Sequence, residues 1–123
     1  MSWLSRIIGP KPNRRDTGGS QGLDAQTLVQ MAKAGADLSK PTEVINYLYL
    51  PVQASAEAAG NELRSAGFDV TVRPAAKGSD WLALAKIQLV PNQPNIKLLR
   101  DRFEELAVRF GGEFDGWEAA ITK

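Results

Sequence analysis

The most distinctive string of the chain is Gly112-Glu-Phe-Asp-Gly-Trp-Glu118, close to the C-terminus. Asp115-Gly116 predicts a tight backbone feature, a bulge or turn that enters a last strand. Trp117 supplies a large ring with one polar N–H, next to the carboxylate of Glu118. Because large aromatic rings usually serve packing, we expect Trp117 in the core. The four residues from Asp115 to Glu118 are also our candidate contact with a partner.

Two tyrosines, Tyr47 and Tyr49, alternate on one expected strand and therefore share a sheet face. Rings on an open sheet can stack nucleic-acid bases, with Arg73 and Lys86 available for phosphates. The neighbouring strand, residues 81–89, lacks the Lys/Arg-Gly-aromatic pattern of RNA-recognition sheets. We therefore interpret Tyr47 and Tyr49 as core or interface residues, and keep an RNA-binding module on the open sheet face as the alternative.

Three carboxylates, Asp101, Glu104 and Glu105, lie close together in the sequence and suit a cation. The same expected helix carries three arginines: Arg100, Arg102 and Arg109. This mixture favours local ion pairs on a solvated helix face over a metal site.

The amino-acid composition excludes most common kinds of catalytic site. The 123 residues include no cysteine and no histidine, which excludes disulfides, thiolate nucleophiles, Cys- or His-ligated zinc and Ser-His-Asp hydrolysis. An enzyme would depend on carboxylates, lysine, tyrosine or an oxygen-ligated cation, and the sequence offers no paired acid and base. We expect no enzyme, no catalytic residue, no metal and no cofactor.

Charge is divided unevenly along the chain. The total is +1, with 15 Lys+Arg against 14 Asp+Glu, but residues 1–40 carry +3 and residues 41–123 carry −2. A nucleic-acid-binding domain would more often be strongly basic. Apolar runs are too short for a secretory signal or a membrane span, so we expect a cytoplasmic protein.

Residues 1–22 are expected to form a short apolar helix followed by a flexible basic linker. Apolar side chains between Ser2 and Ile8 recur at helical spacing, and Gly9-Pro10 ends the pattern. Residues 11–22 are rich in Gly, Pro, Ser and Arg without periodicity. Residues 1–9 have three candidate roles: packing on the domain, docking on a partner, and a weak contact with a membrane surface.

Residues 23–123 are expected to form one domain. Asp24 is a candidate N-cap for a helix that ends at Gly35. The expected elements after it are a strand at 43–50, a helix at 55–66, strands at 68–73 and 81–90, a helix at 94–110 and a strand at 114–121. This β-α-β-β-α-β order is the split βαβ plan of a ferredoxin-like sandwich, an α+β fold with four antiparallel strands and two helices on one face. Here it carries an extra N-terminal helix.

The two expected central strands, 43–50 and 81–90, are apolar on both faces. A sheet that meets helices on one face and water on the other should alternate instead. The second face therefore needs a cover. The candidates are the helix at 24–34, the N-terminal segment, a second copy of the chain in a homodimer, and a ligand.

Several runs together resemble the RraB family of regulators of ribonuclease E activity, also called ribonuclease E inhibitor proteins. These runs are Ala66-Gly-Phe-Asp-Val70, Trp81-Leu-Ala-Leu-Ala85 leading to Val90-Pro91, Arg102-Phe-Glu104, and Gly111-Gly-Glu-Phe-Asp-Gly-Trp-Glu118. The resemblance spans about residues 42–121. It implies a ferredoxin-like domain and a non-catalytic protein whose partner is ribonuclease E or another nuclease, and which alters the cleavage of transcripts.

Overall fold

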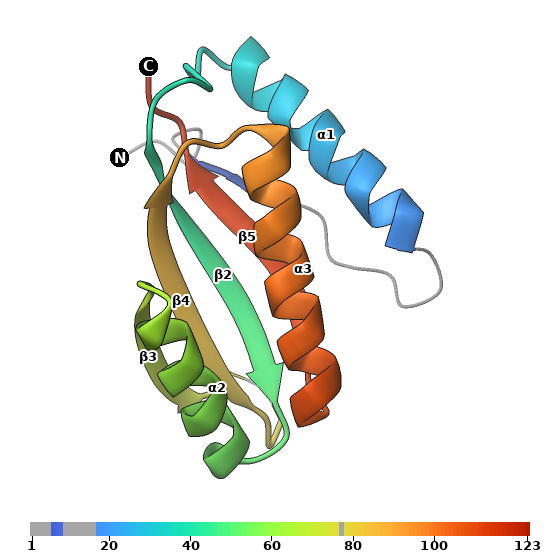
Figure 1. Cartoon of the computed structure of the whole chain (residues 1–123), viewed down its shortest axis with the longest axis vertical. Coiled ribbons are helices and arrows are strands. Elements are labelled where there is room, and N and C mark those ends of the chain that lie inside the picture. The colour runs from blue at the N-terminus through green and yellow to red at the C-terminus, as the bar shows by residue number, and fades with distance from the viewer. Residues whose placement is uncertain (1–5, 9–16, 77) are drawn as a thin grey trace.

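The structure, a computed structural model, describes residues 6–8, 17–76 and 78–123, and side chains from residue 24 onward. In chain order the elements are β1 (Arg6–Ile8), α1 (Thr17–Lys33), β2 (Thr42–Leu50), α2 (Gln53–Ser65), β3 (Asp69–Pro74), β4 (Trp81–Leu89), α3 (Gln93–Phe110) and β5 (Glu113–Ala120) (Figure 1). From β2 to β5 every expected element is present, and each end lies within two residues of the expected one.

The strands form one sheet in the order β1-β5-β2-β4-β3, and every neighbouring pair is antiparallel. The prediction of an α+β fold with an antiparallel sheet is confirmed. β2 and β4 lie at the centre, as expected from their apolar sequences. Among the helices of the described residues, none combines the length and the hydropathy that a membrane span needs.

Helices α2 and α3 lie over the same face of the sheet, and α1 lies beside α3 (Figure 1). Burial alternates strictly along β2: the residues from Thr42 to Leu50 that face these helices are buried, and the residues between them are partly exposed. This core face receives two alanines and a leucine from α2 and mostly large side chains from α3. They are Ala56, Ala59, Leu63, Ile96, Leu99, Phe103 and Leu106.

The prediction of an N-terminal helix over residues 2–8 is wrong for residues 6–8. Residues 6–8 form strand β1, which pairs with Glu118 to Ala120 of β5. The pairing satisfies backbone groups of β5 that would otherwise lie at an open sheet edge, and two consecutive isoleucines favour a strand. As a result β5 is not an edge strand over these residues. Residues 1–5 and 9 lie outside the described residues.

The flexible linker expected over residues 11–22 is also corrected in part. Residues 17–22 belong to α1, which starts at Thr17 rather than at Asp24, and residues 11–16 lie outside the described residues. Three glycines lower helix propensity in this stretch, so the tertiary contacts of the later turns, through Leu28 and Met31, must stabilise the helix. Asp24 therefore lies inside the helix instead of capping it.

The turn between α3 and β5 depends on two glycines. Gly111 ends α3 with a φ of 70°, in the left-handed region that favours glycine. Gly112 approaches β2 so closely that a Cβ there would overlap the carbonyl oxygen of Tyr49 and lie 2.7 Å from Leu50 Cδ1. This close approach sets where β5 begins against β2.

Candidate functional site

Strand β5 contains a bulge at Asp115-Gly116. Its pairing with β2 joins Trp117 to Asn46 and Phe114 to Leu48, so the register shifts by one residue between these pairs. Gly116 has a φ of 101°, a left-handed conformation that side chains disfavour. The bulge expected from the sequence Asp115-Gly116 is thus confirmed, and it requires glycine.

The bulge decides which β5 side chains face the helices. Phe114 and Trp117 are both buried on the helix-covered face, although three positions separate them. Phe114 stacks on Phe103 of α3, with ring centroids 5.1 Å apart. Glu118 instead lies opposite Ile45, on the other face of the sheet.

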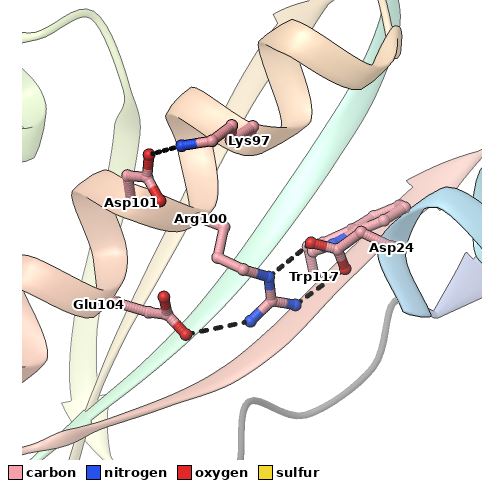
Figure 2. Close-up of polar contacts among 6 residues, drawn as sticks. All are labelled: Asp24, Lys97, Arg100, Asp101, Glu104 and Trp117. Carbon is pink, nitrogen blue, oxygen red and sulfur yellow. Dashed lines mark hydrogen bonds and ion pairs between the residues drawn. The ribbon is translucent and has the colours of Figure 1, made fainter. Parts of the chain in front are cut away.

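A buried polar cluster joins α1, α3 and β5 (Figure 2). The Asp24 carboxylate accepts hydrogen bonds from Arg100 Nε and, at 2.9 Å, from Arg100 Nη2. The same carboxylate accepts a hydrogen bond from Trp117 Nε1 at 3.0 Å. All three side chains are buried, with exposed fractions of 4% for Asp24, 1% for Arg100 and 0% for Trp117. We call these three residues the Asp24 cluster.

Arg100 has further favourable neighbours. Its Nη1 lies 3.5 Å from Glu104 Oε2, and its guanidinium carbon lies 5.3 Å from the centroid of the Phe114 ring. A buried charge is costly unless it is paired and hydrogen-bonded, and the Asp24 cluster meets both conditions. Its paired charges provide a fixed, directional attachment for α1.

The sequence interpretation missed the Asp24 cluster. It placed Arg100 on a solvated helix face and Asp24 at a helix end. One signal was available: Arg100 lies four residues after Ile96 and three before Phe103, both buried, which puts it on the core stripe of α3. No comparable signal identifies Asp24, because its partners are distant in the sequence.

The ion pairs expected along α3 are otherwise present on its exposed side. Lys97 Nζ lies 2.7 Å from Asp101 Oδ2. Arg109 bonds both Glu105 of α3 and Glu62 of α2. The hydrogen bond from Arg109 lowers the pKa of Glu105 below its usual value of 4.5. Within residues 24–76 and 78–123, no group of three acidic side chains is arranged to hold a metal ion.

The face of the sheet opposite the helices, which we call the open face, has an apolar centre. Strand pairing shows which side chains of β2 and β4 lie at this centre. They are Ile45, Tyr47, Tyr49, Leu82 and Leu84; Leu82 is buried and the others are partly exposed. Charged side chains flank this centre on the same face: Glu118, Lys86, Asp69 and Arg73. None of the three described helices covers this face (Figure 1).

Tyr47 and Glu118 are joined on the open face. The Tyr47 hydroxyl donates a hydrogen bond of 2.7 Å to Glu118 Oε1. Tyr47 falls at the register shift, where β2 and β5 are not paired residue to residue, so this side-chain bond connects the two strands at the bulge. Tyr49 lies two residues further along β2, also partly exposed.

The six candidate partner-binding residues are thus divided between two faces. Tyr47, Tyr49 and Glu118 share the open face, and Asp115 is partly exposed at the bulge. Gly116 and Trp117 are buried, so in this structure Trp117 offers no surface to a partner. A role of these two residues in binding would be indirect, through the shape of the bulge.

The helix expected at 24–34 does not cover the open face. Asp24, Leu28 and Met31 of α1 are buried on the helix side of the sheet, where Asp24 bonds Arg100 of α3. Strand β1 extends the sheet at its edge rather than lying over a face. Residues 1–5 and 9–16 lie outside the described residues.

Comparison with models of known protein families identifies a family for this chain. The family model RraB, described as regulator of ribonuclease activity B, matches residues 22–119, which is most of the 123-residue chain. The match covers all of the Asp24 cluster and the Tyr47–Glu118 pair. No curated protein matches the chain.

Proposed function

The chain belongs to the RraB family of regulators of ribonuclease activity, and we propose that it regulates a ribonuclease by binding to it as a protein, without catalysing a reaction. The partner that we propose is ribonuclease E, or another nuclease that degrades transcripts, in the cytoplasm. We also assign the arrangement of β2 to β5, with α2 and α3 on one face, to the ferredoxin-like class.

The observation that supports binding is the open face. Its centre is apolar and partly exposed, while three helices already occupy the other face. Tyrosines are enriched in protein interfaces because they offer a large rigid ring and one polar group. We propose Tyr47, Tyr49, Asp115 and Glu118 as contacts, with Gly116 and Trp117 shaping the strand beneath them.

The Tyr47–Glu118 hydrogen bond supports this choice of contacts. A side chain that is already held in place loses less conformational entropy when a partner binds. Glu118 also contributes a negative charge beside the ring, which would suit a donor or a cation on the partner. The face thus combines a pre-ordered aromatic ring with a directional polar group.

The RNA-binding alternative rests on a specific register. Tyr49 and Arg73 both lie opposite Leu82, and Lys86 lies opposite Ile45, so all these residues share the open face. However, Glu118 bonds the Tyr47 hydroxyl directly, and Asp69 lies opposite Lys86. These carboxylates would repel phosphates next to the stacking rings, which favours a protein partner.

The test measures binding of purified ribonuclease E to the immobilised chain, and the rate at which the enzyme cleaves a transcript. We expect Tyr49→Ala to weaken binding by about tenfold or more. Val108→Ala is the control, because Val108 is 84% exposed on α3, away from the open face. Equal affinities for the two variants would contradict the proposed surface.

A second arm separates the RNA alternative from the protein partner. Binding of single-stranded RNA to the chain alone is titrated with salt, because phosphate contacts weaken steeply as salt rises. RNA binding that falls with salt and is lost in Tyr49→Ala would favour the RNA-binding module. Absence of both RNA and ribonuclease binding would contradict both functions.

A further inference from the structure

The Asp24 cluster is a costly feature that packing alone does not require. Two buried charges must be stripped of water, and apolar side chains of similar size often serve stability equally well. Buried ionic groups are best attested where they fix one register among alternatives. The bulge of β5 offers such an alternative directly beside the cluster.

The two registers of β5 differ in what they place on the open face. With the bulge at Gly116, Trp117 points toward the helices and Glu118 toward Tyr47. Side chains along a strand alternate between faces, so a slip of one residue would exchange them. Trp117 would then enter the open face, and Glu118 would enter the core.

Burial favours the observed register, because a slip would carry the Glu118 carboxylate into the core and Trp117 out of it. Hydrophobic burial is non-directional, however, and does not by itself fix the orientation of the indole. The hydrogen bond from Trp117 Nε1 to Asp24 is directional and forms only when the indole points inward. Arg100 holds the accepting carboxylate in place with two hydrogen bonds of its own.

We propose that Asp24 and Arg100 are positioning residues that lock the register of β5 through Trp117, and so determine that Glu118 and Tyr47 form the contact pair on the open face. Helix α1 does not lie on that face, and it thereby acts on the contact pair only through Trp117. We call this effect of Asp24 and Arg100 on the β5 register the lock, and it is a property of the chain without a partner. Its consequence for a partner rests on the proposed function.

The test uses matched tryptophan substitutions and hydrogen exchange of the full chain. Trp117→Phe keeps an aromatic ring but removes the N–H that Asp24 accepts. Trp81→Phe is the control, because Trp81 is partly buried on β4, outside the Asp24 cluster. We expect amide exchange at residues 115–118 to rise about tenfold or more in Trp117→Phe only, with α3 unchanged. Unchanged exchange at these residues, or an equal rise in both variants, would overturn the lock.

A second variant separates register from stability. The double substitution Asp24→Leu with Arg100→Met replaces the buried pair by apolar side chains. It should melt close to the wild-type temperature, because the apolar packing offsets the loss of the acceptor for Trp117 Nε1. We expect it to show the same faster exchange at residues 115–118. Wild-type exchange in this variant would contradict the proposal, and if the variant does not fold, Trp117→Phe alone decides.

The consequence for the partner is read in a separate measurement. Trp117→Phe should bind ribonuclease E more weakly than Trp81→Phe. Faster exchange with equal affinities would keep the lock and contradict the proposed contact surface. Weaker binding with unchanged exchange would contradict the lock and keep the surface.

Discussion

The two faces of the sheet are built from the same strands but differ in how far their side chains are buried. On the helix-covered face, β2 contributes five buried side chains, and even a carboxylate and a guanidinium are enclosed there. On the open face the same strand presents Ile45, Tyr47 and Tyr49, each partly exposed. The first face stabilises the domain, and the second remains accessible for another molecule. Substitutions on the two faces should therefore act on different quantities.

The largest expected loss of stability comes from the junction that aligns β5 with both faces. Gly112→Ala would place a Cβ against the backbone of Tyr49, which cannot move without disturbing β2. We expect a loss of about 4 kcal/mol or more in the free energy of unfolding, measured by urea denaturation. Gly60→Ala is the control, because a Cβ there would lie 3.2 Å from a Val72 methyl group that can shift. Similar losses in the two variants would contradict this explanation.

The next effect tests whether the buried pair differs from exposed pairs on the same helix. Arg100→Ala leaves the Asp24 carboxylate buried without the partner that donates two hydrogen bonds to it, so we expect a loss of about 3–5 kcal/mol. Lys97→Ala removes an exposed partner of Asp101 and should cost roughly 0.2–1 kcal/mol. Thermal or urea unfolding measures the stability of both variants. A loss for Arg100→Ala as small as that for Lys97→Ala would contradict the difference between buried and exposed pairs.

A direct comparison of the faces uses neighbouring residues of β2. Leu48 is 0% exposed on the helix-covered face, and Leu48→Ala should cost about 2–5 kcal/mol of stability. Tyr49→Ala, on the open face, should cost less stability and reduce the affinity for the ribonuclease more. Unfolding and binding are measured for both variants. We expect Leu48→Ala to lose more stability and Tyr49→Ala to lose more affinity. If the same variant is worse in both measurements, the division of roles between the faces is wrong.

A smaller effect concerns the hydrogen bond that crosses the bulge. Tyr47→Phe keeps the ring and removes the donor to Glu118 Oε1. We expect a loss of about 1 kcal/mol in stability, measured by urea unfolding. Tyr49→Phe provides the matched control on the same strand and face. A larger loss for Tyr49→Phe would show that the bond to Glu118 does not order this face.

The smallest effect lies on the exposed side of α3, away from both faces of the sheet. Hydrogen bonding from Arg109 lowers the pKa of Glu105 in the folded chain, so its contribution to stability is present above the usual value of 4.5 and is lost as the pH falls through the lowered pKa. Glu105→Gln should therefore be slightly less stable than wild type at neutral pH. The difference should shrink below about pH 4.5. Unfolding at a series of pH values checks this, and a difference that grows in acid would contradict it.

Hydrophobic periodicity and turn residues predict the helices, the central strands and the bulge, because neighbouring residues in the sequence determine these features. The apolar stripes of α2 and α3 and the apolar strands β2 and β4 were placed within one or two residues, because periodicity follows directly from burial. The bulge followed from Asp115-Gly116, since only glycine readily adopts the backbone that Gly116 has. The Ile7-Ile8 segment was misread because three residues are too few to distinguish a helical from a strand pattern, and its pairing with β5 decides the outcome.

The α+β class, the central strands, the bulge and the absence of thiol and imidazole chemistry are all predictable from the amino-acid sequence. Each of these follows from residue type or from spacing along the chain. The folded chain brings Asp24 to Arg100 and Trp117, which lie 76 and 93 residues away in the sequence. It also places Tyr47 and Glu118 on one face and Trp117 on the other. Such contacts depend on strand order and register, which are set by the packing of the whole core rather than by any local run of residues.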